Sequence, residues 1–160
     1  MKKILSVLMA IALALGCTAA LAEEEPVIQP APDPDPFSGV WECDRATIEI
    51  VWEEEGYRVL VHWPSSAWEV TTWEYACYYY EEEKRIVSTP FGIRTELLFS
   101  DDSDESVDTV VYDDGAAAFY LDEEGYLIWQ DEKEDAGKDM RFEYVCTIEE
   151  MLAAEAEADG

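Results

Sequence analysis

Residues 39–63 alternate apolar and polar side chains, and this alternation limits the possible folds of the chain more than any other feature of the sequence. A period of two residues is typical of an extended strand with one buried face, and it is interrupted only at Glu54-Glu55-Gly56. We therefore predict a half-buried β-hairpin, on which later strands must pack. The apolar side chains that define its buried face are Ile48, Ile50, Trp52, Val59, Val61 and Trp63.

The rest of the chain repeats this pattern without a segment long enough for a crossover helix. Further strands are predicted at 68–80, 85–89, 94–100, 107–112, 116–121, 126–130 and 140–146, with turns at 81–84, 90–92, 113–115 and 122–125. Roughly eight to ten short antiparallel strands predict an all-β meander that closes into a small up-and-down barrel. The T-x-x-E sequence at Thr147–Glu150 is a capping box and predicts a short C-terminal helix.

The N-terminus has the pattern of a signal peptide. Lys2 and Lys3 precede an apolar run, and Ala20-Leu21-Ala22 forms a small-residue cleavage site. We predict a signal peptide at 1–22 and a secreted, extracellular protein that begins at Glu23. The alternative is a lipid anchor at Cys17, which would hold the protein at the cell surface.

Three further regions follow the signal peptide. Residues 23–36 alternate acids with prolines and predict a stiff, exposed linker without core residues. Residues 37–146 are expected to form the β-barrel domain, and residues 147–160 a short helix with an acidic tail.

The chain is strongly acidic, with a formal charge of −28. Cleavage after residue 22 removes two lysines and leaves eight basic against 38 acidic residues, a charge of −30. Nucleic acids and anionic membranes would repel such a protein, and no later segment approaches the roughly 20 apolar residues that span a bilayer. We expect a monomer without membrane insertion, whose charge serves solubility or attracts a cationic partner.

The three remaining cysteines, Cys43, Cys77 and Cys146, allow at most one disulfide within the chain. If the sheet closes, its first and last strands become neighbours and a Cys43–Cys146 bond becomes possible. The alternative is three unpaired thiols packed as small apolar groups. His62 is the sole histidine and the sequence has no C-x-x-C pair, so a zinc site is not supported.

Six tryptophans are the strongest indication of a binding site, because flat rings stack on sugars or line apolar cavities. Packing in the core is the alternative for each of them. We expect binding near the turn at 64–67 and the aromatic face of the next strand. If Glu69 points inward, Arg45 could neutralise it. The candidate binding residues are His62, Trp63, Ser65, Ser66, Glu69, Trp73 and Tyr75.

No catalytic or metal-binding motif stands out, and we predict neither an enzyme nor a cofactor. Ser65 and Ser66 lie near His62, but they lack the G-x-S-x-G elbow of serine hydrolases. With 38 acids, carboxylate pairs at glycosidase spacing arise by chance. The acidic stretch 101–108 lacks the glycine of an EF-hand and is expected to be a solvated loop.

Two local patterns resemble known families. Gly39-Val40-Trp41 resembles the G-x-W signature of lipocalins and related calycin barrels, and this resemblance implies a late arginine packed across Trp41, for which Arg141 is the candidate. The second pattern is R-A-x-I-x-I at 45–50 followed by H-W-x-S-S-A-x-E-x-x-x-W at 62–73. It resembles an uncharacterised group of small exported β proteins of anaerobic Gram-positive bacteria, which implies a secreted single-domain protein and no particular function.

Two functions remain open from the sequence. The leading hypothesis is a non-enzymatic exported binding domain for a small ligand or peptide. The alternative is an acidic protein-interaction module that docks a cationic partner, for example as an inhibitor of a wall-degrading enzyme. An aromatic cavity above roughly 300 Å³ inside the barrel would favour a small ligand, whereas a filled barrel would favour surface contacts.

Overall fold

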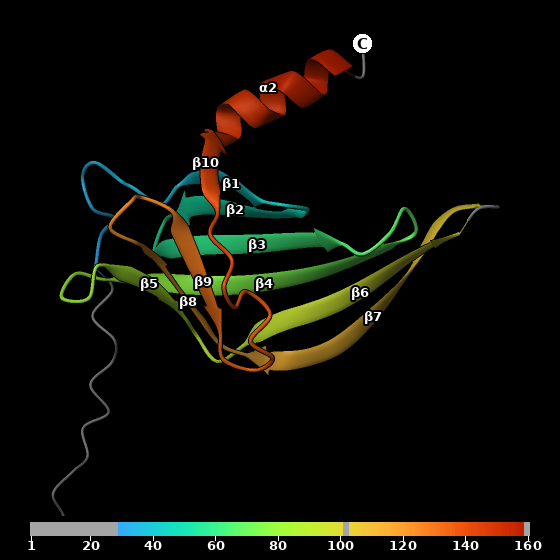
Figure 1. The fold of residues 1–160 in the computed structure, drawn as a ribbon, viewed down its shortest axis with the longest axis horizontal. Helices are drawn as coiled ribbons and strands as arrows, with labels where there is room; N and C mark the ends of the chain where they lie inside the picture. Colours follow the sequence, from blue (N-terminus) through green and yellow to red (C-terminus); the bar gives the residue numbers. More distant parts are fainter. Residues whose placement is uncertain (1–28, 101–102, 159–160) are drawn as a thin grey trace, which may run out of the picture.

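The computed structural model describes residues 29–100 and 103–158, which form one curled antiparallel sheet and one helix (Figure 1). The predicted signal peptide and Cys17 lie outside these residues. The elements are β1 (Gly39–Cys43), β2 (Ala46–Glu53), β3 (Gly56–Pro64), β4 (Glu69–Tyr80), β5 (Arg85–Ser88), β6 (Gly92–Ser100), β7 (Ser103–Gly115), β8 (Ala117–Leu121), β9 (Leu127–Asp131), β10 (Glu143–Cys146) and α2 (Ile148–Ala158).

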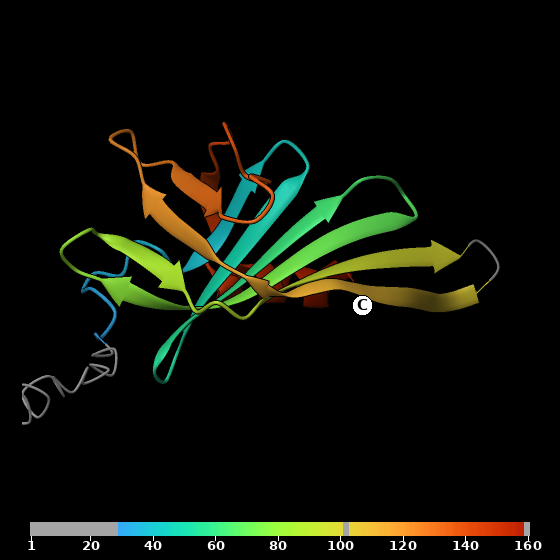
Figure 2. The same cartoon turned by 90° about the horizontal axis from the view of Figure 1, so that it is seen from below.

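The strands form a curled half-barrel. Their order is β10-β1-β2-β3-β4-β5-β8-β9, and β6 pairs with β4 and β7 beside this path. The two ends of the order approach each other at one bridge, where Leu127 and Phe142 exchange backbone hydrogen bonds of 2.9 Å. Figure 2 shows the curl on one side and the extended β6–β7 hairpin on the other. The predicted all-β antiparallel architecture is confirmed, and its closure among the described strands is limited to this bridge.

Strand β4 has two partners on the same edge, because its 12 residues exceed the length of either partner. Its C-terminal part pairs with β5 and its N-terminal part with β6. The predicted chain reversal at Pro90-Phe91-Gly92 is therefore wrong, since β6 continues in the direction of β5 (Figure 1). The predicted tight turn at Asp113-Asp114-Gly115 is also wrong, because β8 continues in the direction of β7.

Close approach of the two backbones explains the glycines at this bend. A Cβ atom at Gly92 would lie 2.5 Å from the ring of Tyr75 and 2.9 Å from the carbonyl oxygen of Gly115. These glycines permit a kink in two paired strands rather than a tight turn, and sequence alone does not distinguish the two.

Two other boundaries differ from the sequence prediction. The segment predicted as one opening hairpin forms three strands, β1 to β3. The additional reversal lies at Asp44 and Arg45, where Asp44 has a φ of 54°. The acidic stretch 101–108 is not a loop from Ser103 onward, since Ser103 already pairs with Ser100. Pairing with the apolar strand β6 outweighs the turn-forming tendency of these acidic residues. Residues 101–102 lie outside the described part.

The predicted buried face is confirmed in register. Ile48 lies opposite Val61 on β3, and Val61 lies opposite Trp73 on β4. All three point into the concave side of the sheet together with the other core residues. The fully buried ones include Ile50, Tyr57, Val59, Tyr75, Cys77, Ile86, Phe119, Leu127, Trp129 and Phe142.

The described part of the predicted linker touches the core. Asp35 accepts hydrogen bonds from the backbone N–H of Phe37 and from the hydroxyl of Tyr57, both at 2.9 Å. Ala31 packs against the core, and the side-chain oxygen of Gln29 accepts the backbone N–H of Glu81. The expectation that this segment carries no core contacts is therefore wrong for residues 29–36, because Tyr57 needs a partner for its buried hydroxyl.

The cysteines are all free thiols in the described structure. Strands β1 and β10 are neighbours, as required for the predicted Cys43–Cys146 bond, but the register places Cys146 opposite Val40. Cys43 lies at the other end of β1, opposite Ala46, so the bond does not form. Cys77 is buried in the core.

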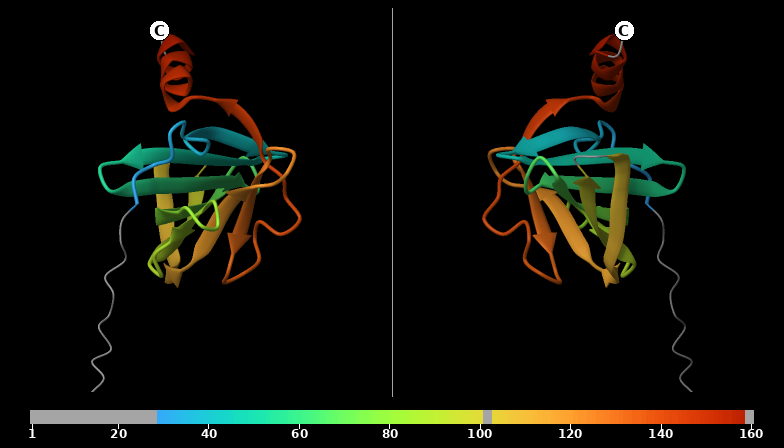
Figure 3. Two further views of the ribbon diagram at one scale, coloured as in Figure 1. Left: turned by 90° about the vertical axis from the view of Figure 1, so that its left-hand side faces the viewer. Right: turned by 90° about the vertical axis from the view of Figure 1, so that its right-hand side faces the viewer.

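The predicted capping box is confirmed. The backbone N–H of Thr147 donates to the carboxylate of Glu150 at 2.9 Å, and the N–H of Glu150 donates to the Thr147 hydroxyl at 3.2 Å. Helix α2 then projects from the end of β10 and buries none of its residues (Figure 3). Within residues 29–100 and 103–158, no helix combines the length and the apolar character needed to cross a membrane.

The Asp35–Tyr57 contact predicts that the segment before β1 stabilises the fold. Tyr57→Phe should lower the free energy of unfolding by ~1 kcal/mol, and Asp35→Ala by about 2 kcal/mol, because it leaves a buried hydroxyl unpaired. Urea denaturation measures both, with Glu42→Ala on the exposed side of β1 as the control. An Asp35→Ala protein as stable as the control would show that the Asp35 contact does not stabilise the fold.

Candidate functional site

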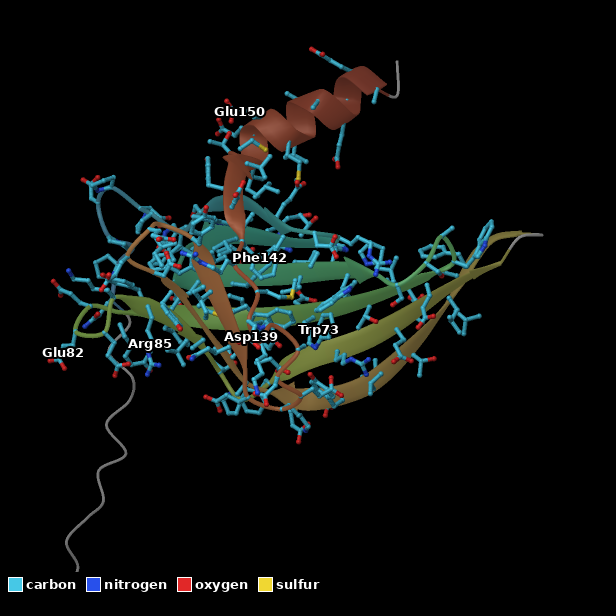
Figure 4. The ribbon with its side chains drawn as sticks, in the orientation of Figure 1. Trp73, Glu82, Arg85, Asp139, Phe142 and Glu150 are labelled. Carbon is cyan, nitrogen blue, oxygen red and sulfur yellow. The ribbon has the colours of Figure 1, made fainter. Side chains whose placement is uncertain are left out.

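Aromatic rings fill the interior of the half-barrel in an unbroken chain. Trp63 lies 6.2 Å from Trp73, Trp73 lies 5.2 Å from Trp129, and the stacked rings of Trp129 and Phe119 are 6.5 Å apart. Phe119 continues the chain to Tyr75 at 5.8 Å. Figure 4 labels Trp73 on β4 and Phe142 on the segment between β9 and β10, which closes over the rings. The packing therefore supports the alternative that Trp73 and Trp129 are core residues.

Polar groups surround these rings where the curl opens toward β6 and β7. The indole N–H of Trp73 donates to the hydroxyl of Tyr112 at 3.0 Å. The guanidinium of Arg94 lies 5.6 Å from the centre of the Trp73 ring. We call Trp63, Trp73, Arg94 and Tyr112 the mouth cluster.

Arg94 has its charge balanced within the protein. Its Nη2 lies 2.9 Å from the carboxylate of Glu96, and its Nε lies 3.3 Å from that of Glu134. The Arg94 side chain is 17% exposed, so it is neutralised and largely covered. The mouth cluster therefore offers no unpaired cation to an anionic ligand.

Asp131 fixes the loop that covers Trp129. This buried carboxylate accepts the backbone N–H groups of Glu134 at 2.8 Å and Ala136 at 3.3 Å, and it lies 3.5 Å from the hydroxyl of Tyr75. Gly137 then sits so close to Trp129 that a Cβ atom would lie 2.7 Å from the ring. The loop thus seals one side of the interior against solvent.

Burial changes the acidity of the tyrosines in this region. Desolvation, with the nearby Asp131 charge, raises the pKa of Tyr112 to about 12. Desolvation also raises the pKa of Tyr75, again with a contribution from Asp131. Both side chains therefore remain neutral hydrogen-bonding groups at physiological pH.

The seven predicted binding residues do not form one site. Trp63 and Trp73 lie side by side, and Glu69 shares their concave face further along β4. Tyr75 is fully buried, and His62 points to the opposite face, where it lies 3.8 Å from Glu49. Alternation along β3 explains why adjacent residues separate in this way.

The remaining two predicted residues, Ser65 and Ser66, form the exposed β3–β4 turn. Their backbone N–H groups bond to the carbonyl oxygen of Glu69 at 2.9 and 3.3 Å. The predicted Arg45–Glu69 pair is not observed, because Arg45 lies 4.0 Å from Asp44 and donates to the carbonyl of Ser65. The turn is held by these backbone bonds, by Arg45, and by the Ser66 hydroxyl, which accepts the backbone N–H of Trp68 at 3.2 Å.

The arginine expected across Trp41 is also placed differently. Arg141 pairs with Asp122 and Glu124, and its guanidinium lies 4.1 Å from the ring centre of Tyr126. The ring next to Trp41 is that of Tyr144, at 5.2 Å. Arg141 lies one residue outside the bridge at Phe142, and this position directs it to the β8–β9 turn instead.

A large groove lies on the convex face, between the β2–β3 turn and the bend between β5 and β6. It has a volume of about 820 Å³. Its floor includes Ala76, Tyr78, Phe91 and Ile93, and its acidic side chains are Glu53, Glu54, Glu55 and Glu74. We call it the acid-rimmed groove. Among its described lining residues Arg58 is the one basic side chain, and it donates to Glu53 at 2.9 Å.

Two other grooves are present in the described part of the chain: the lining of the first is more balanced in charge, whereas the second is lined by Glu42, Glu49 and Glu155 without a lysine or arginine. One, of about 670 Å³, lies between β8, β9 and the following loop, and it contains Arg85, Lys138 and Arg141 as well as four acids. The other, of about 560 Å³, lies between α2 and β1–β3 and includes His62 and Cys146. Figure 4 shows Arg85 and Asp139, which line the first of these grooves.

The acid-rimmed groove was missed in the sequence because its residues come from three separate segments. The sequence analysis assigned Glu54 and Glu55 to the interruption at Glu54-Glu55-Gly56, and Phe91 to another turn. Two strand pairings bring these segments together, that of Arg58 with Ala76 and that of Ile93 with Glu74. The mouth residues Arg94 and Tyr112 were missed for the same reason.

The described residues contain no group of three or more histidine, cysteine, aspartate or glutamate side chains arranged to hold a metal ion. No protein-family model, curated protein or solved structure matches this chain. The grooves and surfaces themselves therefore carry the indications of function.

The raised pKa of Tyr112 predicts a loss of stability at high pH. Between its ordinary value near 10 and its folded value of about 12, the unfolded chain has released this proton and the folded chain retains it. The free energy of unfolding must therefore fall as the pH rises through this window. Urea denaturation at pH 8, 10 and 11 should show a shallower fall for Tyr112→Phe than for the wild type; equal slopes would contradict the burial of this phenol.

Proposed function

We propose that this chain is a non-enzymatic exported binding domain, and that it binds a cationic peptide segment in the acid-rimmed groove. The observation that carries this proposal is the combination of an apolar floor and a glutamate rim in one groove of about 820 Å³. A groove of this size is in the range of known ligand sites. The segment could belong to a free peptide or to an exposed part of a cationic protein, such as a wall-degrading enzyme.

The floor of the groove provides an apolar anchor point. Phe91 is 73% exposed and Ile93 is 38% exposed, although both are large apolar side chains. Such side chains gain free energy when a partner covers them, and aromatic contacts often dominate binding energy. A partner residue with an aliphatic or aromatic side chain would fit over them.

The rim selects for positive charge. Glu54, Glu55 and Glu74 have no ion pair with any basic side chain in the described structure, whereas Glu53 pairs with Arg58. The whole chain carries a formal charge of −28, so its field attracts basic partners and repels acidic ones. We infer that lysine or arginine flanks the apolar anchor of the bound segment.

The filled interior favours this surface site over an internal ligand cavity. Phe119, Leu127 and Phe142 are 0% exposed and Trp129 is 1% exposed, so rings occupy the space that a ligand would need. The small-ligand alternative would then require one of the outer grooves. Its expected aromatic lining from Trp63 and Trp73 is engaged in packing.

We also propose a distant architectural relationship to lipocalin-like calycin barrels, in which closure is reduced to the Leu127–Phe142 bridge. Gly39-Val40-Trp41 at the start of β1 supports it, as does the burial of Trp41, whose indole donates to the carbonyl of Phe37 at 2.9 Å. The C-terminal helix supports it as well. The position of Arg141 does not support it.

The proposed groove predicts that binding depends on both charge and an apolar anchor. The probe is the peptide acetyl-Lys-Phe-Lys-Leu-Arg-Lys-amide, titrated into the full chain by calorimetry at low and at ~0.15 M salt. The double variant Glu54→Lys, Glu55→Lys should weaken binding ~10-fold, mainly at low salt. Phe91→Ala should weaken it about 5-fold at both salt concentrations, since apolar contacts are not screened.

The matched control is Glu123→Lys, which changes an exposed glutamate in the β8–β9 turn, away from the groove. It should alter the affinity less than ~2-fold, as expected for a distant surface charge. If Glu123→Lys had half the effect of the Glu54→Lys, Glu55→Lys double variant on the binding free energy, in proportion to the charge changed, net charge alone would attract the peptide. Equal binding of the same peptide with glutamate in place of each basic residue would refute the proposal.

A further inference from the structure

Strand β7 presents a free sheet edge. It contains 13 residues, and β6 is its partner among the described strands. The β6–β7 hairpin extends away from the curl, so neither the closing strands nor α2 covers its far part (Figure 2); at the C-terminal end of β7, Lys133 lies 4.8 Å from the ring centre of Tyr112 and pairs with Asp114. A row of backbone N–H and C=O groups on the outer side of β7 therefore faces solvent.

This edge also exposes apolar side chains. Val107 is 63% exposed, Val110 is 60% exposed and Val111 is 43% exposed. On the neighbouring strand, Leu98 lies opposite Val107 and is 49% exposed. An added strand could thus form backbone hydrogen bonds and cover apolar surface at the same time.

The features that usually protect an edge are weak here. Residues 103–115 contain no proline, lysine or arginine. The β6–β7 pairing shifts register at three places, between Gly92 and Arg94, between Arg94 and Thr95, and between Phe99 and Ser100, and it is regular from Thr95 to Phe99. The charged side chains along Ser106–Gly115 are all acidic, namely Asp108, Asp113 and Asp114.

From these observations we propose that the edge of β7 accepts an extended segment of a basic partner protein by β-strand addition. Backbone hydrogen bonds form along β7, apolar side chains of the partner cover Val107 and Val110, and its lysines or arginines approach Asp108 and Asp113. Asp114 already pairs with Lys133 and contributes less. The acid-rimmed groove and this edge use different residues, so the inference does not depend on the proposed groove.

A second copy of this chain is a poor occupant of the edge. Each copy carries a formal charge of −28, and the described part of β7 has no basic side chain that could meet Asp108 or Asp113 of another copy. Like charges on facing strands destabilise a pairing, whereas opposite charges stabilise it. The acidity that opposes self-association therefore favours a basic strand.

The test uses the peptide acetyl-Lys-Val-Lys-Thr-Val-Lys-Val-Lys-amide and the same peptide with its four central backbone nitrogens methylated. Methylation keeps the charges and side chains but blocks hydrogen bonds along both edges of the peptide. We expect the methylated peptide to bind the full chain at least ~10-fold more weakly, since backbone pairing supplies much of the affinity in strand addition. The unmodified peptide should slow hydrogen exchange of β7 backbone amides.

Matched variants locate the contact. Val110→Lys should weaken binding of the unmodified peptide ~10-fold, because it replaces an apolar contact with a like charge on the edge. Leu152→Lys makes a similar change at a 54% exposed position of α2 and should alter binding less than ~2-fold. The effect of Val110→Lys should persist in the Glu54→Lys, Glu55→Lys background, in which the groove no longer attracts a basic peptide, and this separates the edge from the groove.

Three results would overturn the inference. The first is equal affinity of the two peptides, which would show that charge alone drives binding. The second is the absence of new exchange protection in β7 when the unmodified peptide binds. The third is a dimer of the free protein in sedimentation equilibrium with β7 amides already protected, which would assign the edge to a second copy.

Discussion

The need to bury large aromatic side chains on one face of a single sheet determines this structure. Trp73, Trp129, Phe119 and Tyr75 contact one another in sequence across the concave face, although they come from three strands of different regions of the chain. A flat sheet would leave such a face in water. Curling brings β8 and β9 over β3 and β4, so that each ring covers the next and little space remains inside.

The curl is uneven because β4 is longer than the strands that pair with it. Its C-terminal part belongs to the curled half, where β5, β8 and β9 follow and Leu127 reaches Phe142. Its N-terminal part supports β6 and β7, which remain extended (Figure 2). One end of the protein is therefore a sealed core, and the other is an open sheet whose edge and convex face are available to partners.

Charge and exposed apolar surface act together on this open part. Phe91 and Val110 are more than half exposed, in a protein whose formal charge of −28 opposes association with copies of itself. In our proposal, this exposed apolar surface contacts another molecule, and the negative charge favours a basic partner. Both proposed surfaces follow from this combination, which a neutral protein with the same fold would not have.

The sequence by itself determined the strand content, the inward face of β2–β4 and the cap of α2, because alternation and capping depend on residues that are close in the chain. Only the tertiary structure decided that Gly92 bends a strand without reversing the chain, that Asp35 contacts Tyr57, and that Cys146 faces Val40. The tertiary structure also decided the candidate sites. Alternation alone predicts that His62 and Trp63 lie on opposite faces, but Phe91 and Glu54 line the same groove only because strand pairing brings them together. Pairing joins residues far apart in the chain, and its register depends on how the whole sheet buries its rings.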